Sequence, residues 1–227
     1  MRWLARALAL VAALVVAVQL WFLGRVIYWK YNPPASTSFM SARLDALREK
    51  DPKARLAHQW VGYERVSVHL KRAVVSAEDA KFIDHEGFDW EGIQRALDKN
   101  QKKGKVVSGG STITQQLAKN LFLSGERSYL RKGQEAAIAA MLEAVMDKRR
   151  ILEIYLNVVE WGENIFGAEA AARHYFGVSA AQLSPAQAAR LAAMLPRPRF
   201  YQRNPGSRYL GEYTARILAR MGSAQVP

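Results

Sequence analysis

The sequence predicts a mainly α-helical protein that is preceded by one transmembrane helix. Apolar residues recur at steps of three and four through most of the chain after Ser41, whereas the alternating patterns of strands are scarce. Near the N-terminus, residues 7–24 form an eighteen-residue apolar run in which Gln19 is the only strongly polar side chain. As a helix this run spans roughly 27 Å, close to the hydrocarbon thickness of a membrane.

We interpret the apolar run as an uncleaved anchor. A cleaved signal peptide is the alternative, because Arg2 and Arg6 resemble a basic leader, but the same two arginines favour a cytoplasmic N-terminus. Aromatic residues suited to the far membrane interface are Trp21, Phe22, Tyr28, Trp29 and Tyr31. The expected organisation is a cytoplasmic end at 1–6, an anchor at 7–28, a Pro/Ser-rich linker at 29–40 and one domain at 41–227.

Composition narrows the class of partner. Lys and Arg outnumber Asp and Glu by 33 to 20, which gives a formal charge of +13 and favours polyanions or an anionic surface. Because the chain carries an apparent anchor, lipid phosphates are expected and nucleic acid is not. The chain has no cysteine, which excludes disulfides, thiolate metal sites and a cysteine nucleophile.

Helices are expected, in chain order, over residues 68–81, 90–101, 112–122, 129–148, 168–175 and 185–194. Asp89 is the expected N-cap of the second, and Ser184 followed by Pro185 begins the last. The segment 129–148 is rich in the strong helix formers Ala, Met, Leu and Glu. One buried helix face is predicted from the spacing of Ile151, Ile154, Tyr155 and Val158. The basic segment 201–227 is expected to be helical, with no assigned role.

Glu78 and Asp79 close an apolar helix stripe and precede a loop that contains Asp84, His85 and Glu86. A carboxylate in such a setting can be partly desolvated, which raises its pKa and makes it a usable general base. The alternative is an acidic helix end followed by a solvated loop, in which His85 is a structural hydrogen-bonding residue.

A glycine-rich segment lies about twenty residues further along. Gly109 and Gly110 precede Ser111 and Thr112, a composition that suits an anion at a helix N-terminus. The alternative is a flexible turn with an ordinary N-cap. The phosphate-loop pattern of nucleotide-binding proteins is absent from the sequence. Polar or basic side chains then follow on the predicted helix: Gln115, Gln116, Lys119 and Asn120.

A third group combines guanidinium and carboxylate side chains. Arg127, Arg131 and Glu135 fall at four-residue steps, with Lys132 beside them, and Glu143 lies about 80° further round the helix, so that these charges could converge. A surface ladder of ion pairs is the alternative. No zinc-binding spacing is present, so any metal is expected to be a hard cation held by carboxylates and substrate phosphates.

These segments resemble the five motifs of the peptidoglycan glycosyltransferases, the family shared by class A penicillin-binding proteins and their stand-alone relatives. The motifs follow the family's order and match residues 78–89, 109–119, 131–143, 148–157 and 170–177. Residues 157–162 and 166–169 are similar in particular to the monofunctional, biosynthetic branch of Gram-negative bacteria.

The resemblance implies a lysozyme-like fold with a larger head lobe and a smaller, membrane-proximal jaw lobe. It implies polymerisation of lipid II into linear glycan strands, with inversion to a β-1,4 linkage and release of undecaprenyl diphosphate. Glu78 would be the general base, and Glu135 would lie by the donor diphosphate. The substrate-binding residues implied are Asp79, Phe82, His85, Gly110, Ser111, Thr112, Gln115, Gln116, Lys119, Asn120, Arg127, Arg131 and Lys132.

The same resemblance implies the surroundings of the reaction. The implied cofactor is a divalent cation, Mg²⁺ or Mn²⁺, with Glu135 as its contact. The partners implied are lipid II, the growing glycan strand, inner-membrane lipid, and cell-division or elongation proteins. The location implied is the cell inner membrane, crossed once, with the catalytic domain in the periplasm. No serine precedes a lysine by three positions and no further domain follows, so transpeptidase activity is not expected.

Two other functions are compatible with parts of the sequence. A lytic, lysozyme-like muramidase would use a single glutamate as a general acid on finished polymer, and it would not need Lys119, Arg127 and Arg131 for a diphosphate. A non-catalytic anchored scaffold or nucleic-acid binder would use the positive charge on any polyanion.

Overall fold

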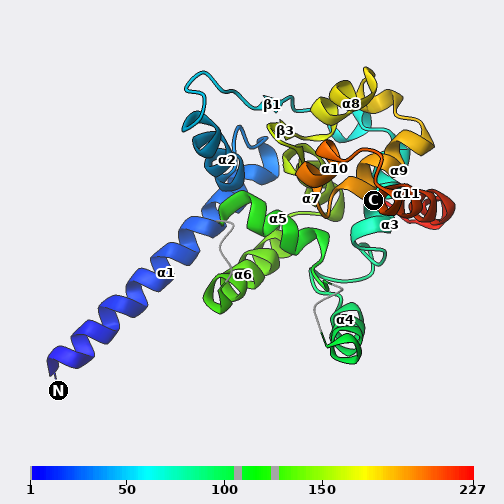
Figure 1. The fold of residues 1–227 in the computed structure, drawn as a ribbon. Coiled ribbons are helices and arrows are strands. Elements are labelled where there is room, and N and C mark those ends of the chain that lie inside the picture. Colours follow the sequence, from blue (N-terminus) through cyan, green and yellow to red (C-terminus); the bar gives the residue numbers. More distant parts are fainter. Residues whose placement is uncertain (1, 105–108, 124–127) are drawn as a thin grey trace.

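A computed structural model describes residues 2–104, 109–123 and 128–227 (Figure 1). The described chain is mainly helical, which confirms the predicted class, and it fits a lysozyme-like fold. Its α-helices are α1 (Arg2–Tyr31), α2 (Ser38–Arg48), α3 (Val68–Glu78), α4 (Trp90–Lys103), α5 (Ile113–Phe122), α6 (Tyr129–Val145), α7 (Lys148–Val158), α8 (Ala168–Phe176), α9 (Pro185–Met194), α10 (Pro198–Arg203) and α11 (Arg208–Arg220). Short 3₁₀ helices are η1 (Tyr63–Arg65), η2 (Ala180–Gln182) and η3 (Met221–Ser223).

A small sheet lies beside α8. Its strands are β1 (Ala57–His58), β2 (Glu160–Gly162) and β3 (Ile165–Phe166), in the order β1-β3-β2. β1 is parallel to β3, with Ala57 opposite Ile165, and β2 is antiparallel to β3. Gly167 follows at φ 83°, and a Cβ there would lie 2.6 Å from the carbonyl oxygen of Asn157, so only glycine fits this close approach.

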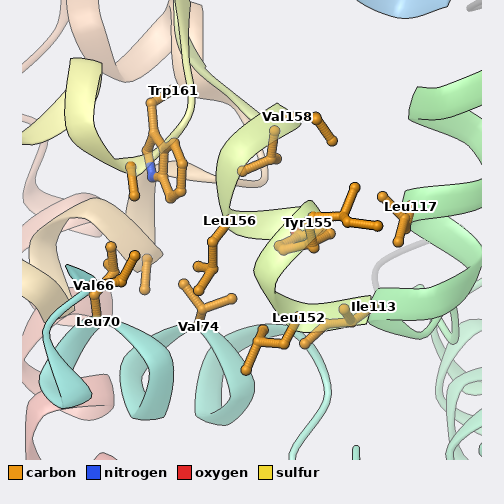
Figure 2. Packing of buried hydrophobic residues seen from close by; sticks show 14 of the residues in the cluster. Val66, Leu70, Val74, Ile113, Leu117, Leu152, Tyr155, Leu156, Val158 and Trp161 are labelled. Atoms are coloured by element: carbon orange, nitrogen blue, oxygen red, sulfur yellow. The ribbon is translucent and has the colours of Figure 1, made fainter. Parts of the chain in front are cut away.

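Helix α7 is the centre of the core. The predicted face of Ile151, Ile154, Tyr155 and Val158 is buried, but Leu152, Leu156 and Asn157 are buried as well. Figure 2 shows Leu156 lying toward Val74 of α3, while Leu152 lies beside Ile113 of α5 and Tyr155 lies on the side of Leu117. From Ile151 on, only Glu153 of this helix is partly exposed, so α7 is covered by neighbours on most sides and lies between α3 and α5.

Several helix boundaries differ from the expected ones for local reasons. Helix α3 ends at Glu78 and not at 81, because the backbone of Asp79, at φ −162°, is no longer helical. The segment 129–148 is divided into α6 and α7, because Met146 is extended and the side chain of Asp147 accepts from the Arg150 N–H as an N-cap. The expected N-caps Asp89 and Ser184 are confirmed.

Helix α1 is long and apolar enough to cross a membrane, by length and composition. Residues 2–18 are exposed, and Figure 1 shows this half of the helix projecting from the body of the protein. The other half packs against the domain. Phe22 and Trp29 are buried, and their rings lie 5.1 Å and 4.9 Å from that of Phe122 at the end of α5. The side-chain amides of Gln19 and Gln134 also exchange hydrogen bonds of 2.9 and 3.1 Å.

Arg150 of α7 ties the C-terminal end of α1 to the domain. Its Nη2 donates to the carbonyl oxygens of Trp29 (2.8 Å) and Asn32 (2.9 Å), and its Nη1 donates to Glu153 (2.6 Å). Carbonyls in the last turn of a helix have no partner within the helix, and a cation there also complements the helix dipole. The anchor therefore enters the domain as a packed helix, and the chain leaves it only at Asn32.

We predict that Arg150→Ala lowers the free energy of unfolding by about 1–3 kcal/mol, because it leaves partly buried carbonyls without donors. Thermal unfolding of the full chain in detergent measures this loss. Arg149→Ala is the matched control, since Arg149 pairs with Glu64 at an exposed surface where about 0–1 kcal/mol is expected. Equal effects of the two substitutions would contradict the prediction.

Candidate active site

The carboxylate of Asp79 joins the first two sequence motifs. Its Oδ2 accepts from the backbone N–H of Ile113, the first residue of α5, at 3.0 Å. Its Oδ1 lies 2.9 Å from Nε2 of His85, whose Nδ1 accepts from the N–H of Gly87 at 3.1 Å. These contacts place the histidine proton on Nε2, which donates to Asp79. The N-terminus of α5 is thus occupied by an anion of the protein itself.

Thr112 also connects the loop after α3 to the start of α5. Its hydroxyl donates to the carbonyl oxygen of Gly87 at 2.7 Å, and it accepts from the N–H of Gln115 in a capping box. Gly87 has φ 85°, and Gly110 lies so near α4 that a Cβ would be 3.0 Å from the Cα of Ile93. The loop and the start of α5 therefore require glycine at these two positions, one for its backbone conformation and one for close approach.

Glu78 lies at the end of α3 and faces α5. Nε2 of Gln116 donates to Glu78 Oε2 at 2.8 Å, and the hydroxyl of Tyr155 donates to Gln116 Oε1 at 3.0 Å. Tyr155 therefore orients the amide so that its N–H₂ points toward Glu78. Burial raises the pKa of Glu78, and the negative charge of Asp79 raises it further, while the Gln116 hydrogen bond and the Lys119 ammonium oppose the shift.

A cavity of about 250 Å³ opens beside Glu78. Its walls come from the end of α3, the start of α4, the segment before α5 and the end of α11, and they include Asp89, Arg95, Ser111 and Arg220. A carboxylate with a raised pKa at the wall of a cavity suits proton abstraction from a bound hydroxyl group.

A cationic cluster lies on the other side of Lys119. Glu135 is buried on α6, and its carboxylate accepts from Arg131 Nη1 at 2.9 Å and from Lys132 Nζ. Lys132 Nζ also donates to the Ser111 hydroxyl at 3.2 Å. Burial lowers the pKa of the Lys119 amine, with smaller effects of the same sign from Arg131 and Lys132, while Glu135 and Glu78 oppose them. Lys119 is therefore coupled to both carboxylates.

The carboxylate of Glu135 already has two cationic partners. One oxygen accepts from Arg131 and the other from Lys132, so a metal ion at Glu135 would have to share these oxygens with them. Within residues 2–104, 109–123 and 128–227, no three His, Asp or Glu side chains gather in a way that could hold a metal. The divalent cation stays a prediction, and no chemical step below is assigned to it.

The remaining predicted site residues fall into two groups. The buried ones are Asp79, Phe82, Thr112, Gln115 and Asn120, and of these Asp79 and Thr112 line the cavity. Partly or fully exposed residues are His85, Gly110, Ser111, Gln116, Lys119, Arg131 and Lys132. Arg127 lies outside the described residues. The expected convergence of Glu143 with Glu135 is not found, because Glu143 instead accepts from Thr114 (2.6 Å) and Lys148 (2.8 Å).

Sequence reasoning missed the role of Tyr155, which it placed only on a buried helix face. The signal was available, because a buried tyrosine among aliphatic residues needs a partner for its hydroxyl. The structure supplies that partner as Gln116, so Tyr155 connects the centre of the core to the candidate base.

We predict that Glu78→Gln stabilises the fold at neutral pH. The partly buried carboxylate is costly to ionise, because burial raises its pKa, and glutamine keeps an acceptor for Gln116 without the charge. Below the pKa of glutamate in the unfolded chain both states are protonated, so the gain should vanish there and reach its full size above the raised pKa of the folded state. Melting temperatures of both proteins as a function of pH measure it, and a gain that does not vary with pH would contradict it.

Comparison with known proteins identifies the family of the chain. The transglycosylase family model matches residues 45–222. Proteins described as biosynthetic peptidoglycan transglycosylases are similar along the whole chain: one from Azoarcus sp. (strain BH72) is 63% identical over 100% of this chain and 97% of its own. Those from Dechloromonas aromatica (strain RCB) and Laribacter hongkongensis (strain HLHK9) are 61% and 56% identical over 100% of this chain, and over 98% and 100% of their own. The chain therefore belongs to the transglycosylase family, the glycosyltransferases of peptidoglycan synthesis.

Proposed function

We propose that the protein polymerises lipid II into linear glycan strands, with inversion to a β-1,4 linkage, release of undecaprenyl diphosphate and no transpeptidase activity. The observation that supports it best is the pairing of two unlike carboxylates across Lys119. Glu78 is a partly buried carboxylate with a raised pKa beside a cavity, whereas Glu135 is neutralised by Arg131 and Lys132.

In this mechanism Glu78 is the general base. The 4-hydroxyl oxygen of the acceptor sugar attacks the anomeric carbon of the lipid-linked donor, and its proton passes to the Glu78 carboxylate. The bond from the anomeric carbon to the phosphate oxygen breaks, and the diphosphate leaves with the bonding electrons. Attack on the face opposite an α-linked diphosphate gives the β linkage.

The leaving group explains why one base suffices. A glycosidase must protonate the sugar oxygen that departs, and it therefore needs an acid as well as a second carboxylate. A diphosphate departs unprotonated if cations neutralise its developing charge. Lys119, Arg131 and Lys132 supply such charge within one cluster, and Glu135 orients two of them. Arg127 remains a further predicted contact.

The setting follows from the anchor. We place the protein in the cell inner membrane, crossed once by α1, with the N-terminus in the cytoplasm and the domain in the periplasm. Tethering the enzyme to the bilayer that holds a lipid-linked substrate raises the effective concentration of both. Partners among cell-division or elongation proteins remain a prediction.

We predict that Glu78→Gln lowers polymerisation of labelled lipid II by about 10²- to 10⁴-fold, the usual contribution of a general base. Gel analysis of the glycan formed by the purified chain in detergent measures it. Glu86→Gln is the matched control, because Glu86 is an exposed carboxylate of the neighbouring loop. A folded Glu78→Gln protein at the wild-type rate would remove Glu78 as base. Release of muropeptides from sacculi without use of lipid II would favour a muramidase.

A divalent cation, Mg²⁺ or Mn²⁺, remains part of the proposal. We expect EDTA to reduce polymerisation and added Mg²⁺ or Mn²⁺ to restore it. Because Glu135 is already paired with Arg131 and Lys132, we expect the melting temperature of the protein to be unchanged by EDTA. Full polymerisation in EDTA would contradict a metal requirement.

A further inference from the structure

Two side chains of α11 form hydrogen bonds with the end of α3, the helix that carries Glu78. The hydroxyl of Tyr213 donates to the carbonyl oxygen of Ala77 at 3.2 Å. Arg220 donates through Nη2 to the carbonyl oxygen of Ser76 at 2.7 Å and through Nε to the Ser76 hydroxyl at 3.0 Å. Ser76 and Ala77 are the two residues before Glu78, so α11 contacts the last turn of α3 directly.

The last turn of α3 needs such donors. The final carbonyls of a helix have no partner within the helix, and a glycine in the left-handed conformation often ends the helix so that backbone N–H groups can reach them. The residue that follows α3 is instead Asp79, whose carboxylate is bound to His85 and Ile113. The side chains of Tyr213 and Arg220 supply donors to this turn, and the guanidinium also complements the negative end of the helix.

Helix α11 is a fixed support for these contacts. Leu210 and Ile217 are fully buried in the core, and Met221 follows in η3. Figure 1 shows α11 beside α3 and α9, with the C-terminus close to them. Arg220 is also one of the residues that line the cavity beside Glu78. Arg220 therefore both binds Ser76, two residues before Glu78, and forms part of the cavity wall.

We propose that Tyr213 and Arg220 are positioning residues that hold the last turn of α3 and so set the place of the Glu78 carboxylate in the cavity. The proposal rests on the assignment of Glu78 as the base. It gives a role to the basic C-terminal helix, for which the sequence alone suggested none. Neither residue needs to contact the reacting atoms.

The contacts of α11 with the last turn of α3 should also affect the pKa of Glu78. If the last turn of α3 loosens, water reaches the Glu78 carboxylate, and the part of its raised pKa that comes from burial is lost. The acidic limb of the rate profile would then move to lower pH. The charged or titratable groups around Glu78 are Asp79, Lys119 of α5, Tyr155 of α7, Tyr213 and Arg220 of α11, and Asp89 and Arg95 across the cavity.

The test compares Tyr213→Phe, Arg220→Gln and Arg220→Lys with the wild-type full-length chain in detergent. Lipid II polymerisation is measured against substrate concentration and pH, with melting temperatures recorded in parallel. Arg208→Gln is the matched control, because Arg208 lies on the same helix but pairs with Glu212 in an exposed position. Glu78→Gln is included so that failure of the base assignment is seen separately.

We expect Arg220→Gln to lower kcat by about ten- to a hundredfold, the size of loss that a small misplacement of a catalytic group produces. KM for lipid II should change little, and the acidic limb should move to lower pH. Tyr213→Phe, which removes one oxygen, should shift the limb in the same direction by less, and Arg220→Lys should recover part of the rate. Arg208→Gln should match wild type.

Two results would overturn the proposal. One is a wild-type kcat and acidic limb in both Tyr213→Phe and Arg220→Gln. The other is a loss of kcat that follows the loss of folded protein while the limb stays in place, which indicates stability alone. If Arg220→Gln does not fold, Tyr213→Phe decides the question. A wild-type rate in Glu78→Gln would instead reject the base assignment.

Discussion

The carboxylate of Asp79 is the interaction on which the arrangement of the site depends. It binds the N-terminus of α5 through Ile113 and the loop after α3 through His85, and it follows Glu78 directly in the chain. One buried carboxylate therefore sets the distance between the candidate base and the helix that carries Gln116 and Lys119. An anion at a helix N-terminus is stabilised by the helix dipole and by free N–H groups. The Asp79 carboxylate and the N-terminus of α5 therefore satisfy each other.

The two remaining carboxylates of the site differ because their neighbours differ. Glu78 has an amide and one ammonium group near it, and burial dominates its acid–base behaviour. Glu135 is bound by a guanidinium and an ammonium group from its own helix, at positions four and three residues before it. Two carboxylates in different environments differ in acid–base behaviour. One can therefore serve proton transfer while the other serves electrostatic support.

The anchor belongs to the same structural unit as the site. Phe22 and Trp29 of α1 pack on Phe122, which ends α5, and Arg150 of α7 binds the last carbonyls of α1. Helix α5 also carries Gln116 and Lys119, and α7 carries Tyr155. The position of α1 is therefore connected by direct packing to the helices around Glu78, whereas the sequence suggested an apolar helix separated from the domain by a linker.

The sequence by itself determined the helical class, the apolar N-terminal helix and the caps at Asp89 and Ser184, because these depend on local periodicity and capping chemistry. The roles of Glu78 and Glu135 came from the family resemblance and stay predictions. Only the tertiary structure decided which polar groups meet. One partner of Asp79 lies 34 residues away and one of Glu143 lies 29 residues away, while the partners of Tyr155 and Arg220 lie 39 and 144 residues away. Such pairs are set by how α3, α5, α7 and α11 pack around a common core, which no spacing along the chain encodes.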